Sequence, residues 1–530
     1  MPYMFLKYLI PCLSLLCTLQ LTAQTIDVQH YKFNLELSDA SDTIVGSAQV
    51  QLKLLQPAKQ FSLQLKNVTA GKGMHVANVN GSYVQSFEHS GDRILIQLHA
   101  IPHPDSVYTY HIQYRGVPAD GLIIAKNKWS DRTFFSDNWP NRAHYWLPCN
   151  DTPADKATGE FAVTAPEHYQ VISNGVRIEE SNITGNRILT HWREAVPIPT
   201  KVMVIGAARF AVKNYADSSR IHAVSAWVYP QDSTKGFYDY ALAPSILRFF
   251  NNYIGDYAFT KLANVQSKTI FGGMENASAI FYAENTVTGT RSSEGLIAHE
   301  IAHQWFGNTA TEKSFAHLWL SEGFASYMTH LYLESKYGRD TLLNGLKKDR
   351  DKIVLFQKRW KQPVVDSTSE LMDLLNANSY QKGSWVLHML RTEVGDAVFQ
   401  KIIQSYYQQF KGRNANTKDF QQIVEAATGK NWETFFHQWL SVPGHPQLQV
   451  QWQQTADRTI QVTVKQLQTT PFVFPLRIAL RTQSGALPIH KLEITKREET
   501  FTLKGFPNIQ QLALDPLTEL VFEGNVAKGN

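Results

Sequence analysis

The sequence predicts a multidomain protein with an antiparallel β N-terminal domain, a mainly α central domain and a small C-terminal β-sandwich. The chain has 530 residues, which is too many for a single core, because domains usually contain roughly 100–200 residues. Apolar and polar residues alternate near both ends of the chain, whereas the middle has the spacing of amphipathic helices. We expect domains over residues 24–207, 208–442 and 443–530, preceded by a signal peptide over residues 1–23.

The first residues have the features of a secretory signal peptide. Lys7 precedes an apolar run over residues 8–16, and small residues follow before Gln24. The run is shorter than the ~20 residues that a membrane-spanning helix needs. We therefore expect an exported protein without a transmembrane segment, located in the periplasm, at the cell surface or in the medium. The alternatives are a buried first strand or a lipid anchor at Cys12 or Cys17.

Composition argues against several classes of protein. The hydrophobic fraction is 43% and the charged fraction is 18%, which is ordinary for a globular protein. The net charge of +5 is spread along the chain without a basic block, so nucleic-acid binding is not indicated. Removal of the signal peptide would leave only Cys149, which excludes an intrachain disulfide and a thiolate metal site.

Alternation of apolar and polar residues predicts the two β domains. In the N-terminal domain the runs include Tyr31, Phe33 and Leu35, and later Ile94 and Ile96, with Gly, Asn, Asp and Pro clusters between them. The segment SVPGHPQ (441–447) marks a boundary before the C-terminal domain. Alternation returns there, at Leu448, Val450 and Trp452, and predicts a β-sandwich of roughly 80 residues.

The central domain has apolar residues at helical spacing. Each predicted helix ends at a glycine, which suits a helix C-terminus. The segments are ALAPSILRFFNNYIG (241–255), IAHEIAHQWFG (297–307), FASYMTHLYLESKYG (324–338) and SWVLHMLRTEVG (384–395).

The second of these helices carries a candidate metal site. His299 and His303 are four residues apart, so on a helix their imidazoles lie on one face and can converge on one tetrahedral ion. The alternative is a pair of core or surface histidines. Apolar residues on more than one side of this helix favour the metal site, because two buried histidines without partners would be costly. A catalytic zinc usually takes a third protein ligand, and Glu322 on the next helix is the candidate. Alternatively, Glu322 is not a ligand but a carboxylate in the first turn of a helix, where the helix dipole favours a negative charge.

Three motifs in this region resemble peptidase family M1. This is the gluzincin family of zinc aminopeptidases that contains aminopeptidase N and leukotriene hydrolase. HEIAHQWFGN (299–308) precedes WLSEGFASY (319–327), with eighteen residues between His303 and Glu322 as in that family. FGGMEN (271–276) resembles its GxMEN motif, and SYQKGSWVLHML (379–390) resembles its YxKG segment. The resemblance implies a thermolysin-like catalytic domain that binds one Zn²⁺ ion per chain.

The resemblance assigns roles to the residues of these motifs. His299, His303 and Glu322 would bind zinc, which acidifies its bound water. Glu300 points away from the ligand face and would take the proton of that water. Tyr380 would donate a hydrogen bond to the oxyanion, although a tyrosine outside this motif would as readily be structural.

The GxMEN motif would bind the substrate. A carboxylate at Glu275 can pair with the free α-ammonium of a peptide and disfavours internal cleavage. Gly272 and Gly273 allow the backbone to approach an extended peptide, although they also suit an ordinary turn. Met274 and Asn276 complete the predicted substrate-binding segment.

The sequence departs from the family in three places. Relatives carry a second amine-binding Gln or Glu where Trp139 stands, and Asp137 or Asn138 are the candidate substitutes. The usual Asn before the third ligand is Ser321. Many relatives continue into a large C-terminal helical domain, whereas this sequence ends after the predicted sandwich, so we expect a more open cleft.

These features favour an aminopeptidase that acts on peptides with a free N-terminus. The first alternative is an epoxide hydrolase of the leukotriene hydrolase type, for which the sequence offers no lipid pocket. The second is an inert zinc-containing peptide-binding protein, which would be expected to have lost a ligand or the base. The preferred N-terminal residue and the oligomeric state cannot be read from the sequence.

Overall fold

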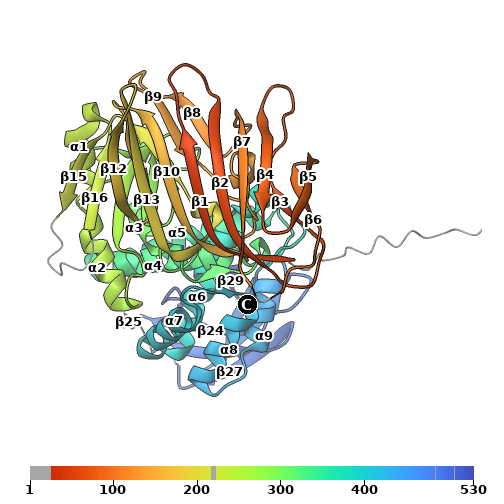
Figure 1. Cartoon of the computed structure of the whole chain (residues 1–530). Helices are drawn as coiled ribbons and strands as arrows, with labels where there is room; N and C mark the ends of the chain where they lie inside the picture. Colours follow the sequence, from red (N-terminus) through yellow and green to blue (C-terminus); the bar gives the residue numbers. More distant parts are fainter. Residues whose placement is uncertain are drawn as a thin grey trace, which may run out of the picture.

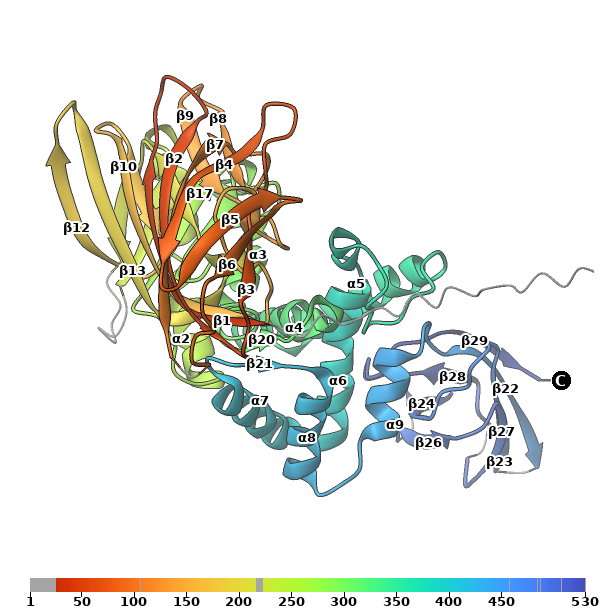
Figure 2. The ribbon, with the colours of Figure 1, turned by 45° about the vertical axis from the view of Figure 1, so that its right-hand side comes forward.

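The computed structural model describes residues 25–529 except 105, 216–222, 457, 484, 487 and 507. The predicted signal peptide over residues 1–23 lies outside the described residues. A β-rich N-terminal region is followed by a helical region and then by C-terminal sheets, as the sequence predicted (Figure 1). Figure 2 shows that most of the helices lie between the N-terminal and the C-terminal groups of sheets.

The N-terminal region is built on a seven-stranded sheet of order β12-β13-β10-β1-β2-β7-β4. Alternate residues of β1 and β2 are buried, in agreement with the predicted period of two. The strands are β1 (Ile26–Glu36), β2 (Ile44–Leu54), β4 (Gly73–Gly81), β7 (Tyr108–Val117), β10 (Lys156–Pro166), β12 (Val176–Ile183) and β13 (Arg187–Pro199).

The prediction of an antiparallel domain is wrong for one pair of strands, because β1 and β10 run parallel. Strands β2 to β9 separate them along the chain, so a long connection joins them instead of a hairpin. Two smaller sheets complete the region. One contains β11 (Gln170–Ser173), β14 (Ile205–Ala208), β9 (Arg132–Ser136) and β8 (Leu122–Lys126), and the other contains β3 (Gln60–Gln64), β6 (Arg93–Leu98) and β5 (Val84–Ser90). The predicted domain limit at residue 207 falls within β14.

The central region combines a five-stranded sheet with most of the helices. The sheet has the order β15 (Ala211–Tyr215), β16 (Ala223–Val228), β17 (Lys261–Ser267), β19 (Ala279–Ala283) and β18 (Gly273–Met274). A two-stranded sheet pairs β20 (Thr311–Glu312) with β21 (Asn414–Ala415). The helices are α1 (Ser233–Tyr240), α2 (Ala243–Tyr253), α3 (Glu294–Ala302), α4 (Trp319–Tyr337), α5 (Arg339–Gln357), α6 (Gly383–Val394), α7 (Asp396–Phe410), α8 (Thr417–Thr428) and α9 (Glu433–Phe436). Two π-helical turns, η7 (Asn378–Lys382) and η8 (His437–Ser441), adjoin α6 and α9.

The predicted helices are present, but one of them ends early. α4 and α6 end at Gly338 and Gly395, whose φ angles of +92° and +81° suit glycine. By contrast, α3 ends at Ala302 instead of Gly307. The N–H groups of Gln304 and Trp305 bond three residues back, which tightens the chain into turns directly after His303.

The C-terminal region consists of two sheets joined to the helices by the Pro/Gly segment. Alternate residues are buried in both sheets, including Val450, Val462 and Ile478. One sheet contains β27 (Glu498–Lys504), β23 (Thr459–Gln466), β22 (Gln447–Ala456) and β29 (Glu523–Lys528). The other contains β25 (Gly485–Ala486), β24 (Phe474–Thr482), β26 (His490–Ile494) and β28 (Gln511–Leu514).

Two further features bear on the sequence predictions. Cys149 is a free cysteine with a fully buried side chain, and burial raises the pKa of its thiol well above the ordinary value. Among the described residues, no helix combines the length and the apolar character that crossing a membrane requires.

Candidate metal centre and active site

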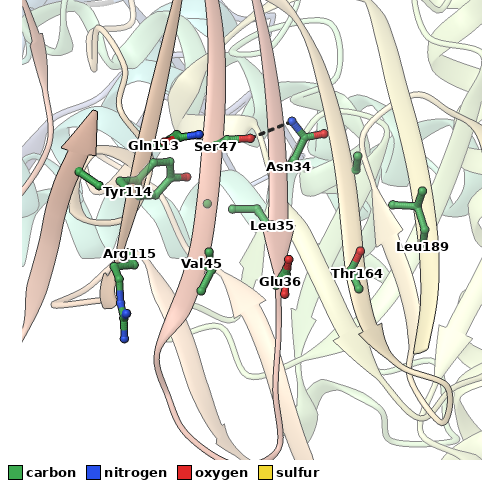
Figure 3. Close-up of a pocket in the computed structure, with 13 residues that line it drawn as sticks. Asn34, Leu35, Glu36, Val45, Ser47, Gln113, Tyr114, Arg115, Thr164 and Leu189 are labelled. Atoms are coloured by element: carbon green, nitrogen blue, oxygen red, sulfur yellow. Dashed lines mark hydrogen bonds between the residues drawn. The ribbon is translucent and has the colours of Figure 1, made fainter. Parts of the chain in front are cut away.

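Among the hollows on the described part of the molecule, two differ clearly in their chemistry. The larger, of about 440 Å³, lies across β1, β2, β7 and β10 (Figure 3). Its lining residues include one acid, Glu36, but no histidine or cysteine. The smaller, of about 220 Å³, lies where α3, α4, β18 and η7 meet. Its lining contains most of the titratable residues that the sequence singles out, namely Glu275, His299, Glu300, Glu322 and Tyr380. The candidate site is therefore the smaller hollow.

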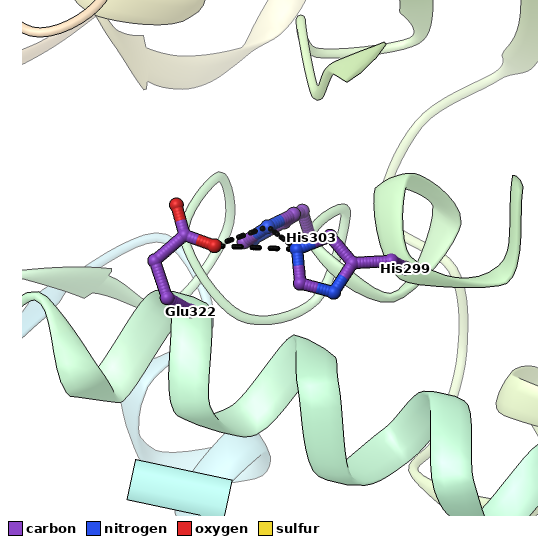
Figure 4. A group of neighbouring side chains, drawn as sticks. All are labelled: His299, His303 and Glu322. Atoms are coloured by element: carbon purple, nitrogen blue, oxygen red, sulfur yellow. Dashed lines mark hydrogen bonds and ion pairs between the residues drawn. The ribbon is translucent and has the colours of Figure 1, made fainter. Parts of the chain in front are cut away.

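The three predicted metal ligands converge at this hollow (Figure 4). His299 Nε2 and His303 Nε2 lie 3.0 Å apart, and Glu322 Oε2 lies 3.2 Å from each of them. Neighbouring ligand atoms of one tetrahedral zinc ion lie roughly 3.3 Å apart, given bonds of about 2.0–2.1 Å. The geometry of this donor set therefore fits a single divalent cation.

The orientation of His303 is set by the atoms behind it. Its Nδ1 lies 3.0 Å from the carbonyl oxygen of Phe306 and 3.1 Å from Ser321 Oγ. An N–H at Nδ1 that donates to the carbonyl leaves Nε2 with a free lone pair that faces the other ligands. The serine that stands in place of the family's usual asparagine thus contacts a ligand directly.

Electrostatics at the ligand group favour a cation. Burial lowers the pKa of His303, but the carboxylates of Glu322 and Glu275 outweigh it and raise that pKa to about 10. Burial raises the pKa of Glu322, but the two histidines outweigh it and hold that pKa well below the ordinary value. In the metal-free protein, a proton on His303 therefore supplies the positive charge that a metal ion would otherwise bring.

Glu300 lies beside the ligand group and is closely packed. Its carboxylate lies within 4.8 Å of ligand atoms of Glu275 and His303. A Cβ atom on Gly273 would lie 2.4 Å from Glu300 Oε1, so a larger residue there would displace the Glu300 side chain. The sequence predicted that Gly273 lets a peptide approach, and the structure adds that it makes room for the proposed base. Burial, partly offset by the charge of His303, raises the pKa of Glu300 well above its ordinary value.

Glu275 presents a buried carboxylate to the pocket. The residue is 5% exposed, and its Oε1 has no hydrogen-bond partner among the described residues. Its backbone carbonyl accepts hydrogen bonds from Gln304 Nε2 at 2.8 Å and from Asn308 Nδ2 at 2.7 Å. Sequence reasoning missed both amides, although they stand inside the HEIAHQWFGN motif.

The rest of the GxMEN segment divides between the pocket and the core. Gly272, Gly273 and Met274 line the pocket, whereas Asn276 is fully buried and does not. Gly273 and Met274 form β18, which is the last strand of its sheet. One side of this strand is therefore not paired within the sheet.

Tyr380 lies on η7, opposite His299. The two rings stack with centroids 5.8 Å apart. Burial and the carboxylate of Glu322 raise the pKa of Tyr380 well above its ordinary value, so the phenol keeps its proton. The turn approaches α4 closely because glycines meet there. A Cβ atom on Gly323 would lie 2.9 Å from the backbone of Gly383.

Polar contacts that the sequence did not reveal fix the two ends of η7. At one end, Gln357 on α5 lies between Asn378, at 2.9 Å, and His445, at 2.6 Å, in either orientation of its amide. At the other end, Lys382 Nζ donates to the carbonyl of Gly444 at 2.8 Å. Lys382 is fully buried, and burial lowers its pKa to about 7.

Neither predicted substitute for the second amine anchor lines the pocket. Asp137 accepts hydrogen bonds from Arg142, from the hydroxyl of Thr269 and from the backbone N–H of Ile270, at 2.7, 2.9 and 2.9 Å. Asn138 is fully buried and donates to the carbonyl of Met203 at 2.6 Å. Trp139 lines the pocket instead. The hypothesis that Asp137 or Asn138 faces the substrate is therefore wrong, because both side chains hold the surrounding loops together.

This arrangement defines the HExxH class of metal-dependent hydrolases, in which a helix presents two histidines and a following helix presents a carboxylate. Comparison with known proteins narrows the class. Residues 238–439 match the Peptidase family M1 domain, and residues 27–202 match the Peptidase M1 N-terminal domain. The chain belongs to peptidase family M1.

Individual relatives agree with this assignment. Human glutamyl aminopeptidase is 25% identical over 451 residues, which are 79% of this chain and 47% of the human protein. Probable aminopeptidase 2 of Sulfurisphaera tokodaii is 28% identical over 57% of this chain and 40% of its own length. Aminopeptidase M1 of Arabidopsis thaliana is 27% identical over 58% of this chain and 36% of its own. The chain spans about half the length of the curated relatives it matches, or less.

The first prediction concerns the metal. We expect Glu322→Ala to weaken Zn²⁺ binding by at least the roughly 10–100-fold that loss of an outer-shell partner costs, because it removes one of three ligands. Titration of the metal-free protein against a chromogenic chelator measures this affinity without any substrate. Glu370→Ala removes an exposed carboxylate and serves as the control. Equal zinc affinity of the two variants would show that Glu322 is not a ligand.

The second prediction concerns Lys382. Below pH 7 it is charged in the folded and the unfolded chain, whereas between about pH 7 and 10.5 only the unfolded chain keeps the proton. Raising the pH through this window therefore favours the folded state. We expect the free energy of unfolding of the wild type to rise relative to that of Lys382→Met by up to about 1.4 kcal/mol per pH unit.

Urea denaturation at several pH values between 7 and 9.5 measures this difference. Lys347→Met, which removes an exposed lysine of α5, should show no such trend relative to the wild type. If the difference between the wild type and Lys382→Met stayed constant with pH, Lys382 would keep an ordinary pKa in the folded protein.

Proposed function

We propose that this chain is a zinc-dependent aminopeptidase that hydrolyses the N-terminal peptide bond of peptides. One observation carries the proposal: the ligand atoms of His299, His303 and Glu322 converge at a hollow that the carboxylates of Glu300 and Glu275 also line, and Glu275 Oε1 has no hydrogen-bond partner among the described residues. Membership of peptidase family M1 and the aminopeptidase relatives support it.

His299, His303 and Glu322 would hold the zinc ion. When bound, zinc supplies a Lewis acid that acidifies water and polarises a carbonyl group. Glu300 then serves as the general base. It accepts a proton from the water that attacks the scissile carbonyl and passes this proton to the leaving amine nitrogen. A bound cation also opposes the rise in the pKa of Glu300 that burial causes, and so favours its ionised form.

Tyr380 and Glu275 orient the substrate and stabilise the developing charge. The phenol of Tyr380 donates a hydrogen bond to the oxygen that becomes negative during attack. The carboxylate of Glu275 pairs with the α-ammonium of the substrate, which places the first peptide bond at the ligand group. The open side of β18 allows the peptide backbone to pair as an added strand.

The two alternative functions have less support. For an epoxide hydrolase the sequence offers no lipid pocket, and an aminoacyl-arylamide assay beside a lipid epoxide assay separates the two activities. An inert zinc-containing peptide-binding protein has no use for Glu300 beside the ligands. We also propose that the protein is exported, because of the apolar run after Lys7.

Replacement of the proposed base tests the mechanism. We expect Glu300→Gln to lower kcat on aminoacyl-arylamides by roughly 10²–10⁴-fold, because the amide cannot accept the proton. Zinc content should stay unchanged, since Glu300 is not a ligand. Glu370→Gln is the matched control at an exposed position. Normal turnover by Glu300→Gln would exclude Glu300 as the base.

Replacement of the tyrosine tests oxyanion stabilisation. We expect Tyr380→Phe to lower kcat by roughly 10²–10³-fold with little change in KM, because its hydrogen bond strengthens only as charge develops. Steady-state kinetics measure both constants. Tyr238→Phe alters a half-exposed tyrosine on α1 and should leave them unchanged. A change confined to KM would assign Tyr380 to ground-state binding only.

A further inference from the structure

We propose that Trp139 determines specificity and that the pocket selects peptides whose first residue is apolar and uncharged. This inference rests on the proposed aminopeptidase function and names its substrate class. Trp139 stands where a second amine-binding residue was expected, and neither of its acidic or amide neighbours faces the pocket. The α-ammonium of a substrate therefore has one carboxylate anchor, Glu275, and the wall beside it is aromatic.

The walls that remain for the first side chain are apolar. The ligand group takes the scissile carbonyl and Glu275 takes the ammonium, so the side chain between them must face the other lining residues. Apart from glycines, the acids and Tyr380, these are Trp139, Phe271, Met274, Leu296 and Leu375. An aliphatic or aromatic side chain would leave water and bury its surface against this wall, which favours binding.

Trp139 is held rigidly in that wall. It is 2% exposed, and it packs edge to face against Phe271 and Phe315, with ring centroids 5.9 and 5.8 Å apart. Its indole N–H is buried without a hydrogen-bond partner among the described residues. Aromatic packing, not a hydrogen bond, therefore fixes this side chain, and the surface that it offers a substrate is apolar.

The charges around the pocket oppose an acidic first residue. The described lining residues include the carboxylates of Glu275, Glu300 and Glu322 but no lysine or arginine. Arg142 lies behind the wall, 5.9 Å from the centre of the Phe271 ring, and pairs with Asp120 at 3.0 Å and with Asp137 at 2.7 Å. A carboxylate on the first side chain would lose water beside like charges and gain no partner.

The test compares three aminoacyl-arylamides of similar length, whose first residues are methionine, glutamine and glutamate. We expect kcat/KM to fall in that order, with methionine preferred over glutamate by roughly a hundredfold or more, because the carboxylate stays unpaired. Trp139→Ala should lower the preference for methionine over glutamine at least tenfold, whereas Trp139→Phe should keep it within about threefold. Trp129→Phe, at a partly exposed tryptophan outside the pocket, is the control.

Binding measurements separate this inference from the proposed function. Calorimetry on the zinc-loaded protein should detect methioninamide and little glutamic acid α-amide. Tight binding of methioninamide without release of any amino acid would overturn the proposed function and leave the specificity of the pocket standing. If glutamyl compounds were cleaved or bound as efficiently as methionyl compounds, the inference would be overturned even though the enzyme is active. If the Trp139 variants do not fold, the three-substrate comparison on the wild type still tests whether the pocket prefers an apolar, uncharged first residue.

Discussion

The site depends on three side chains whose ligand atoms face one another at close range. His299, His303 and Glu322 come from two helices, and their facing atoms lie 3.0–3.2 Å apart. Two more carboxylates, Glu275 and Glu300, are buried beside them. Such a group of acids is unfavourable on its own, because each charge has lost water and meets its like. One divalent cation relieves this repulsion, so metal binding and stability of the site are linked.

The scaffold holds these groups in place by polar contacts with the backbone around them. Gln304 and Asn308, which follow the two histidines in the chain, donate hydrogen bonds to the carbonyl of Glu275 and so link the anchor to the ligand segment. Asp137 accepts a hydrogen bond from the N–H of Ile270, in the segment that leads into β18. The N-terminal region therefore positions the substrate-binding segment, and Trp139 is the only described residue that it contributes to the lining of the pocket. Trp139 therefore accounts for two features of the pocket: the second amine anchor is absent, and an aromatic wall stands in its place.

Local spacing explains which parts of the site the sequence could predict. His299 and Glu300 lie on α3, and the N–H of His303 directly after it still bonds to the carbonyl of His299, so the geometry of these residues follows from helical spacing. The end of α3 at Ala302 did not follow, because turns formed by Gln304 and Trp305 replace the helix there. Contacts between distant segments were also beyond sequence reasoning. The parallel pairing of β1 with β10 and the close fit of Gly273 to Glu300 exist only once the chain has folded.

The segment that leads into the C-terminal sheets contacts the turn that carries Tyr380, and so influences the site indirectly. Lys382 at the end of this turn donates to Gly444, in the segment that leads into those sheets. Gln357 bridges the start of the turn to His445 in the same segment. π-helical turns are rare and occur mostly as single turns within α-helices, and here buried polar partners hold the turn at both ends. Two kinds of contact therefore position Tyr380, which lies opposite the ligand group. On one side, the turn packs closely against α4 where glycines meet. On the other side, buried polar groups bind the turn to the C-terminal segment.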